Sequence, residues 1–354
     1  MNKVKELKFD GKTIYCGLDI HKSNWKVNFG MDDKEIGCFS QDPDPELLSK
    51  HFKRNYPGAK VKVVYEAGFS GFGAQRALTE LGIECIVVNA ADVPSSDKER
   101  KRKDDKRDAR KLRRELADGS LKGIYIPDIA MEHARTLLRQ RHRLVLDQTR
   151  CVNRIRHMIM SSGMPLGIQQ QKWSQRFVKQ LQELECGTPE LRKSLDLAIE
   201  EYKQIRIIIK DATLTIRRLS KQPPFAQIQP YLRSIDGLGL INAMVVQTEI
   251  QDIYRFKILD SLCDYAGLVP NMNSSGDRTV IKGITRRCNE FLREALIESS
   301  WILKHKDPAM RMKFNEYEKR MNSNKAIIRI GKHLLSRITY VWKNQIEYQR
   351  CIVG

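Results

Sequence analysis

Residues 13–20 read Thr-Ile-Tyr-Cys-Gly-Leu-Asp-Ile, an apolar run that predicts a buried β-strand with Asp19 near its end. Residues 25–31, Trp-Lys-Val-Asn-Phe-Gly-Met, alternate apolar and polar side chains as a half-buried strand does. Residues 35–40 predict a third strand after a turn. Three consecutive strands joined by short turns indicate an antiparallel meander, which decides the fold class of this part of the chain.

Further strands alternate with helices. Residues 61–65 form a very apolar strand that Glu66 closes, a helix then runs to Leu81, and residues 85–88 form the next strand. A meander followed by helix–strand alternation predicts a mixed α/β sheet covered by helices. Side chains at the carboxyl ends of strands are where such sheets collect ligands, so we expect Asp19 and Glu66 to converge.

The most basic part of the chain also carries acids. Residues 103–112 read Lys-Asp-Asp-Lys-Arg-Asp-Ala-Arg-Lys-Leu, and on a helix Asp105 and Asp108 share one face. Carboxylates held close repel each other unless a positive group lies between them, and Lys, Arg or a divalent cation meets that need. A solvated helix of alternating charge is the plain alternative. With Asp19 and Glu66 at strand ends, a Mg²⁺ site made by all four acids becomes the favoured interpretation.

Composition limits the function further. The 354 residues include 63 Lys and Arg against 43 Asp and Glu, and the net charge of +20 predicts a polyanionic partner, nucleic acid first and anionic membrane second. Eight cysteines without a Cys-x-x-Cys pair argue against a zinc site or a disulfide framework and indicate a reducing compartment. No apolar run of about 18 residues and no signal-peptide core occur, so we expect a cytoplasmic protein without a membrane segment.

The middle of the chain predicts long helices. Residues 130–160 carry apolar side chains at helical spacing with many Arg and His, and residues 189–219 form a second such run. Two long amphipathic helices predict an antiparallel helical hairpin or a coiled coil, with a spacer or dimerisation arm as the preferred role. The arginines of the first run are also candidates to bind phosphates: Arg139, Arg141, Arg143, Arg150, Arg154 and Arg156.

A third segment begins at Pro223-Pro224, which ends the second helix. Residues 232–241 resemble the hairpin of a helix-hairpin-helix, whose Gly-x-Gly turn offers backbone N–H groups to a phosphate. Ser275 is predicted in a polar, Gly-flanked loop, which is an ordinary place for a turn residue. The basic helix start at residues 282–287 can bind a phosphate that this serine attacks. No His lies nearby in sequence, so a Ser-His-Asp triad has no local support.

With these acids and this serine in view, the chain resembles the insertion-sequence transposases that join an Asp-Glu-Asp-Asp (DEDD) domain to a serine-bearing domain. The Piv DNA invertase and bridge-RNA-guided recombinases belong to the same superfamily. The resemblance covers nearly the whole chain in the right order, and its motifs are specific together rather than singly. They are Gly17-Leu18-Asp19, Tyr65-Glu66-Ala67-Gly68, Gly71-Phe72-Gly73, the Lys103 to Ala109 block, Ala266 to Pro270, Ser274-Ser275-Gly276 and Gly283 to Arg286.

The resemblance implies three regions. These are a RuvC-like (ribonuclease-H-like) α/β domain at residues 1–125, a helical coiled-coil region at 126–222 and a mainly helical transposase domain at 223–354. It further implies that the acids bind Mg²⁺ or Mn²⁺ and that Ser275, the second serine of the pair, is the nucleophile that forms a covalent phosphoserine. The metal ligands carried over are Asp19, Glu66, Asp105 and Asp108.

The same resemblance implies the partners. These are target and donor DNA, a bridge RNA as guide, and further copies of the chain in a dimer or tetramer, in the nucleoid of a bacterial or archaeal cytoplasm. Three residues depart from the family pattern. Asp104 replaces a usual Thr, and spacing selects Asp105 as the ligand, while Asn273 replaces an aromatic residue and Cys288 a common Gly. The last two departures bear on substrate fit.

Three other functions fit parts of the sequence. A RuvC-like junction resolvase would use the acids to activate water and would leave Ser275 as a loop residue. A basic RNA- or DNA-binding scaffold would use the acids only to balance Lys and Arg. A sugar-kinase or actin-like ATPase also starts with Gly-x-Asp, but the sequence has no second phosphate loop.

Overall fold

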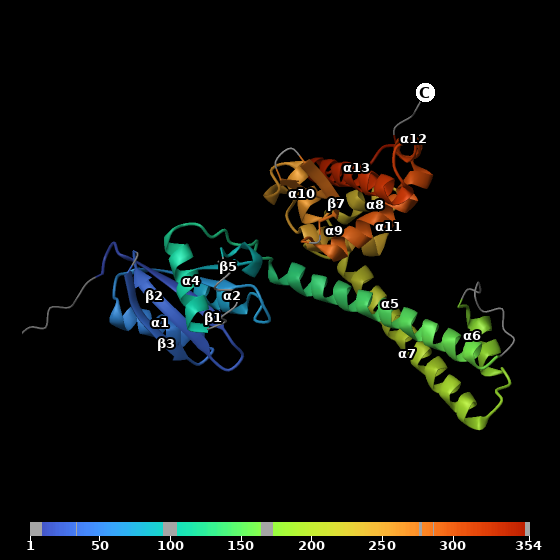
Figure 1. The fold of residues 1–354 in the computed structure, drawn as a ribbon, viewed down its shortest axis with the longest axis horizontal. Helices are drawn as coiled ribbons and strands as arrows, with labels where there is room; N and C mark the ends of the chain where they lie inside the picture. The colour runs from blue at the N-terminus through green and yellow to red at the C-terminus, as the bar shows by residue number, and fades with distance from the viewer. Residues whose placement is uncertain are drawn as a thin grey trace, which may run out of the picture. The chain divides into compact units, whose positions relative to one another are not determined.

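The computed structural model describes residues 9–32, 34–94, 105–163, 173–275, 278–285 and 287–350, and for residues 105, 106 and 270–284 it describes the backbone alone. The chain forms two compact units, residues 1–126 and 127–354, each with its own helices and strands (Figure 1).

A five-stranded mixed sheet with the order β3-β2-β1-β4-β5 lies at the centre of the first unit (Figure 1). The first three strands are the predicted antiparallel meander, and β4 and β5 run parallel to β1. The structure therefore confirms the mixed α/β class. The elements are β1 (Thr13–Ile20), β2 (Trp25–Met31), β3 (Lys34–Gln41), α1 (Pro45–Asn55), β4 (Lys60–Glu66), α2 (Gly73–Glu80), β5 (Glu84–Val88), the 3-10 turn η1 (Ala90–Asp92) and α4 (Asp105–Ala117).

The two faces of this sheet have different covers. On one face, Cys16 and Val63 pack into a core with Phe52 of α1 and further residues of α2. On the other face, Val64 packs with Leu112 of α4. Because successive side chains of a strand point to opposite faces, this division assigns every strand residue to the α1/α2 face or to the α4 face.

The second unit begins with an antiparallel pair of long helices, α5 (Ile129–Ser161) and α7 (Pro189–Leu219), with α6 (Gln175–Gln182) beside their far ends (Figure 1). Arg141 contacts Thr213 and Arg154 contacts Glu201, so residues later in α5 meet residues earlier in α7. The predicted hairpin is confirmed. Local signals explain where it starts, since the side chains of Asp128 and Thr188 cap the two helices and satisfy backbone N–H groups of the first turns.

The base of the hairpin shares a core with the helices that follow. Met131 and Leu138 of α5 pack with Met244 and Val245 of α9. Residues 127–354 are therefore one compact unit, and the functional division near residue 222 stays a prediction. Its further elements are α8 (Gln229–Ser234), α9 (Leu240–Ile250), η3 (Ile253–Arg255), α10 (Leu259–Tyr265), β6 (Pro270–Ser275), β7 (Arg278–Ile284), α11 (Glu290–Lys306), α12 (Pro308–Glu318) and α13 (Ser323–Asn344). In the described parts of the chain, no helix combines the length and apolar character needed to cross a bilayer.

The segment around Ser275 differs from its prediction. Ser275 is the last residue of β6, which pairs antiparallel with β7, so the predicted loop is wrong at this position. Residues 282–284 belong to β7, and the helix expected to start there, α11, starts at Glu290. Strand pairing satisfies the backbone N–H and C=O groups of both segments, and this tertiary pairing overrides the turn preference of Asn and Ser.

Candidate active site

Asp19 and Glu66 lie at the carboxyl ends of the neighbouring parallel strands β1 and β4. The register of these strands pairs Gly17 with Val64, and Val64 packs against α4. Because side chains alternate between faces, the two acids, each two residues further along, are on this same face. The sheet therefore places both predicted ligands at one end of the face that α4 covers.

Contacts at two glycines show how closely α4 approaches this face. A Cβ on Gly17 would lie 2.1 Å from the carbonyl oxygen of Ala109, so strand and helix backbones touch. One turn later, Nη1 of Arg113 lies 3.0 Å from where a Cβ on Gly30 would be. Gly30 lies opposite the first half of β1. Helix α4 therefore lies directly against β1, with the backbone of Ala109 and Arg113 at Gly17 and the Arg113 side chain reaching Gly30 of β2.

Asp105 and Asp108 belong to the first turn of α4. Ala109, whose carbonyl oxygen meets Gly17, directly follows this turn, and Gly17 precedes Asp19 by two positions in β1. The side chain of Asp108 is half-buried. The four predicted ligands come from three elements, β1, β4 and α4, that share one face of the sheet.

A metal centre at these residues stays a prediction. Among the side chains that the structure describes, no three His, Cys, Asp or Glu groups are gathered so that they could hold a metal ion, and Glu66 is exposed. The side chain of Asp105 is not among those described. The chemistry of the donor set does fit a divalent cation, because every predicted ligand offers hard carboxylate oxygens.

His21 is a residue of this site that the sequence analysis missed. Its Nε2 lies 3.1 Å from Oδ2 of Asp19, and the Asp19 side chain is 22% exposed. The contact depends on a tight reversal of the chain just after β1, where the His21 N–H donates to the Asn24 carbonyl at 3.0 Å. The spacing of two residues between an acid and a histidine at a strand end is a signal that could have suggested it.

The chain that leaves Glu66 is tied back to the sheet. The N–H of Ala67 donates to the carbonyl of Val88 at 2.7 Å. The hydroxyl of Tyr65 donates to the carbonyl of Gly71 at 2.9 Å and accepts from the N–H of Gln75 at 3.3 Å. These contacts hold the glycine-containing loop against the strand end, so the backbone on both sides of Glu66 is fixed.

Ser275 belongs to the second unit. Its strand β6 ends at this residue, opposite Arg278 of β7. Below the paired strands, the N–H of Thr285 donates to the carbonyl of Val269 at 3.2 Å, and Nη1 of Arg293 lies 3.0 Å from Sγ of Cys288. Cys288, which departs from the family pattern, therefore packs into the stem of the hairpin.

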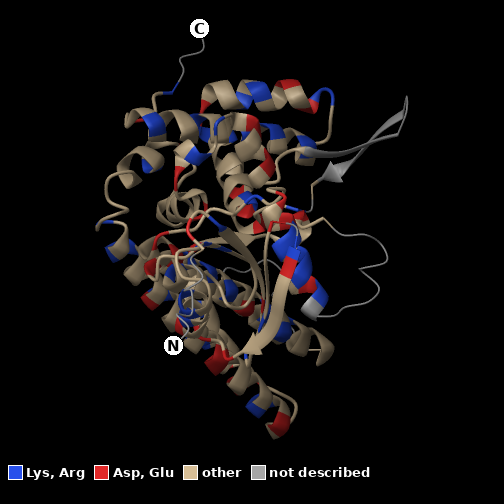
Figure 2. Ribbon diagram, turned by 90° about the vertical axis from the view of Figure 1, so that its left-hand side faces the viewer, with Lys and Arg blue, Asp and Glu red and all other residues tan. Residues whose placement is uncertain are grey.

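The arginines proposed for phosphate binding on α5 are in several cases engaged within the protein. Arg141 donates to Thr213 at 2.8 Å, Arg150 pairs with Asp147 at 2.5 Å and Arg154 with Glu201 at 2.6 Å. Arg139 pairs with the buried Glu249 at 2.8 Å. Figure 2 shows the same intermixing of basic and acidic residues along the helices. Phosphate binding by these four side chains would require their present contacts to be exchanged.

A groove between α6 and α7 offers basic groups in a different setting. It has a volume of about 650 Å³, and its lining includes Tyr202 but no acidic residue. The guanidinium of Arg206 lies 5.7 Å from the centre of the Tyr202 ring. Among the described residues, no ion pair to an acid engages its cations, which are Lys179, Lys203, Arg206 and Lys210.

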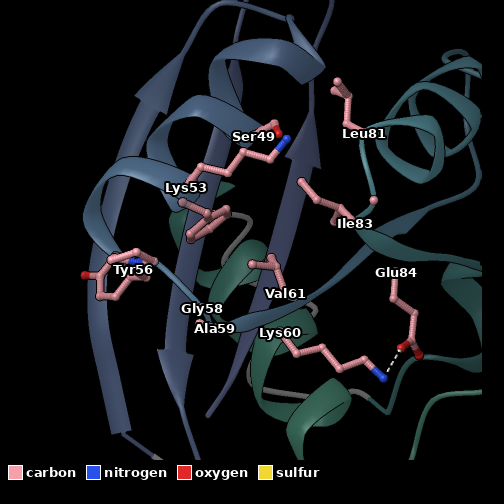
Figure 3. Close-up of a pocket in the computed structure, with 13 residues that line it drawn as sticks. Ser49, Lys53, Tyr56, Gly58, Ala59, Lys60, Val61, Leu81, Ile83 and Glu84 are labelled. Carbon is pink, nitrogen blue, oxygen red and sulfur yellow. Dashed lines mark ion pairs between the residues drawn. The ribbon is translucent and has the colours of Figure 1, made fainter. Parts of the chain in front are cut away.

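A second cavity, of about 340 Å³, is separate from the acids of the first unit. Lys60 and Val61 at the beginning of β4 line it, with Glu84 held 2.9 Å from Lys60 (Figure 3). Glu66 lies at the other end of the same strand, which is about 20 Å long at 3.3 Å per residue. This cavity is therefore not part of the candidate active site.

Two family matches account for most of the chain. Residues 16–163 match the DEDD transposases of the IS110 type, and residues 229–315 match a family described as transposase IS116/IS110/IS902. The chain belongs to the IS110/IS116 family of transposases. This confirms the family expected from the motifs, and the first match contains all four predicted metal ligands and the second contains Ser275.

Individual relatives of the IS110/IS116 family agree with this assignment. The transposase for insertion sequence element IS1111A of Coxiella burnetii is 26% identical over 57% of this chain and 55% of its own length. The transposase for IS1533 of Leptospira borgpetersenii is 26% identical over 68% of this chain and 70% of its own length. The relative y4qE of Sinorhizobium fredii is 30% identical over 69% of this chain. The chain spans 59% of the length of y4qE and little more than half of the IS1111A protein.

Proposed function

We propose that this chain is the transposase of a mobile insertion sequence, an enzyme that cleaves and rejoins DNA strands. The observation that carries the proposal is that Asp19 and Glu66 lie at one end of the sheet face that α4, the helix of Asp105 and Asp108, covers. All lie within the region that matches DEDD transposases, a domain type that implies dependence on a divalent metal. The first unit is, on this proposal, a RuvC-like domain.

Ser275 is the proposed nucleophile. Its Oγ bonds to the phosphorus of a DNA phosphodiester, the bond between phosphorus and the leaving DNA oxygen breaks, and the serine proton ends on that oxygen. The phosphoserine keeps the energy of the broken bond, so a hydroxyl of another strand can displace the serine without ATP. The end position of Ser275 in β6 supports this role, because functional residues are common where regular elements end.

The acids serve the same reaction. Asp19, Glu66, Asp105 and Asp108 are the proposed ligands of Mg²⁺ or Mn²⁺, which when bound neutralises charge on the scissile phosphate. His21, at 3.1 Å from Asp19, restricts the rotation of that carboxylate. The helix–strand contact at Gly17 holds α4, the helix of Asp105 and Asp108, against β1.

A bridge RNA is the proposed guide, and a dimer or tetramer is the proposed active assembly. The net charge of +20 supports polyanionic partners in addition to the DNA substrates. Sequencing the RNA that purifies with the protein tests the guide. Mixing Ser275→Ala with Asp19→Asn tests the assembly, because activity of the mixture requires that acids and serine from different copies act together.

The nucleophile is tested by trapping a covalent protein–DNA adduct. We expect the wild type to form the adduct and Ser274→Ala to form it at reduced yield. Ser275→Ala should form no adduct but should retain folding and DNA binding. Ser274 is the matched control because it is the neighbouring serine of the same strand. Undiminished cleavage in Ser275→Ala would favour the junction-resolvase alternative, in which water is the nucleophile.

A further inference from the structure

Glu249, near the carboxyl end of α9, is a carboxylate with no exposed surface. Its Oε1 and Oε2 accept two hydrogen bonds from Arg139 of α5, at 2.8 and 2.9 Å. Oε2 also accepts from Nδ2 of Asn289 at 2.7 Å. A buried carboxylate is strongly destabilising unless its oxygens are paired, and here a two-pronged guanidinium and an amide provide the pairing.

The partners of Glu249 close the stem of the hairpin that carries Ser275. Tyr265 precedes the first residue of β6 by five positions, and Asn289 follows the last residue of β7 by five. The N–H of Asn289 donates to the carbonyl of Tyr265 at 2.8 Å. The Tyr265 hydroxyl in turn donates to the backbone carbonyl of Glu249 at 3.0 Å. Entry and exit of the hairpin therefore meet at Glu249.

Asn289 also connects Glu249 to the helix α11. Its Oδ1 accepts from the N–H of Leu292 at 3.1 Å and so caps α11. Arg293 of the same helix donates to the carbonyl of Thr285 at 3.2 Å, just beyond β7. The side chain of one asparagine thus joins Glu249, Tyr265 and the start of α11. A displacement of Glu249 would therefore also displace the residues that follow β7.

We propose that Glu249 is a positioning residue for the serine hairpin. It fixes the two ends of the stem through Asn289 and Tyr265, and it couples them to the long helix α5 through Arg139. This inference rests on the proposed role of Ser275 as nucleophile. The position of a nucleophile at the end of a two-stranded hairpin depends on how firmly the stem of that hairpin is held. Small displacements of a reacting group lower reaction rates steeply.

The variant Glu249→Gln is suited to a test because the surroundings support folding without the charge. Arg255 stacks on Tyr265, with 4.7 Å between guanidinium and ring centre, and donates to the carbonyl of Ile250 at 3.0 Å. These contacts hold the end of α9 independently of the carboxylate. The Arg139 side chain is 46% exposed, so it reaches water when its partner is neutral. The matched control is Glu316→Gln, which neutralises an exposed acid of α12 that pairs with Lys313 at 3.1 Å.

Two measurements on the full chain distinguish positioning from a purely structural role. In Glu249→Gln we expect the rate of Ser275–DNA adduct formation at saturating DNA to fall by about tenfold or more, with DNA affinity unchanged within about threefold. We expect faster hydrogen exchange at the amides of Thr285 and Asn289. Arg139→Gln should affect the same step, and the double variant should be no worse than the more impaired single one. Glu316→Gln should change neither measurement.

The outcomes separate this inference from the proposed function. Unchanged exchange at Thr285 and Asn289 overturns the positioning role, and so does a loss of adduct that only parallels a loss of DNA affinity. The positioning role is also overturned if folded Glu249→Gln forms the adduct at a rate within about twofold of wild type. If the wild type forms no adduct that Ser275→Ala abolishes, the nucleophile assignment fails. The exchange measurement still decides whether Glu249 holds the stem.

Discussion

Gly17 of β1 lies directly against the backbone of Ala109 in α4: a Cβ at position 17 would be 2.1 Å from the Ala109 carbonyl oxygen and 2.6 Å from the Arg113 nitrogen. Both obstacles are backbone atoms, so no side-chain rotation relieves them. The absence of a side chain at one strand position is therefore what allows α4, which carries Asp105 and Asp108, to lie directly against β1.

The first prediction follows from this contact. Gly17→Ala forces α4 away from the sheet, and we expect a loss of about 1–3 kcal/mol in the free energy of unfolding, as overpacking of a core costs. The control is Gly73→Ala in α2, where a new Cβ meets no atom within 4 Å. Chemical denaturation of the two variants measures the difference. Equal stability of both would contradict the close approach of helix and strand.

The second prediction concerns the metal. Asp19→Asn and Asp108→Asn remove charged ligands from the proposed site, so we expect each to weaken Mn²⁺ binding by at least about tenfold, in line with the loss of a charged ligand. Asp118→Asn, an exposed acid just beyond the other end of α4, is the control. Titration followed by electron paramagnetic resonance gives the affinities. Wild-type Mn²⁺ affinity in Asp19→Asn would remove this residue from the site.

The elements that sequence could predict are those with local signals. The bounds of α7 agree with the expected residues 189–219, because Thr188 caps the helix, Pro189 opens it and apolar residues recur at helical spacing. The strands at Asp19 and Glu66 were likewise visible as short apolar runs. The apolar composition of each run predicts a strand, and an acid at the end of such a run is easily recognised in the sequence.

The features that sequence missed depend on pairing between distant residues. Ser275 sits in a strand because β7 pairs with it, while its own neighbours, Asn and Ser, favour turns. The bond between Arg139 and Glu249 joins residues 110 positions apart. No local pattern distinguishes Arg139 from the other arginines of α5, so its buried partner emerges only in the folded chain.

The third prediction concerns nucleic acid and the groove between α6 and α7. Lys203→Glu combined with Arg206→Glu places negative charge among its cations. We expect weaker binding of nucleic acid and a shallower salt dependence, since each duplex phosphate contact contributes about 0.9 to the slope of log K against log salt. Lys193→Glu, on the same helix outside the groove, is the control. Equal slopes in both variants would show that phosphates bind elsewhere. Parallel titrations with RNA and with DNA identify which polymer the groove prefers.

The last prediction concerns pH. His333 of α13 stacks on Tyr317, with its Nε2 2.9 Å from the tyrosine hydroxyl. Burial lowers the pKa of His333, and the nearby charges of Arg337, Lys313 and Arg329 lower it further. The unfolded chain, with a histidine pKa of about 6.5, therefore binds more protons than the folded chain in the window below that value. Stability should fall as the pH drops through this window and should be fully present above it.

His333→Asn removes this contribution, so its unfolding free energy should fall less steeply than that of the wild type between about pH 7.5 and pH 5, the range that spans the unfolded pKa. Denaturation series at several pH values measure the slopes. His51, whose pKa burial also lowers, contributes in the same direction and remains in both proteins. His157→Asn, at an exposed position of α5, controls for the loss of an imidazole. A steeper slope in His333→Asn would mean that the folded state favours the charged imidazole, which contradicts a pKa lowered by burial and by the charges of Arg337, Lys313 and Arg329.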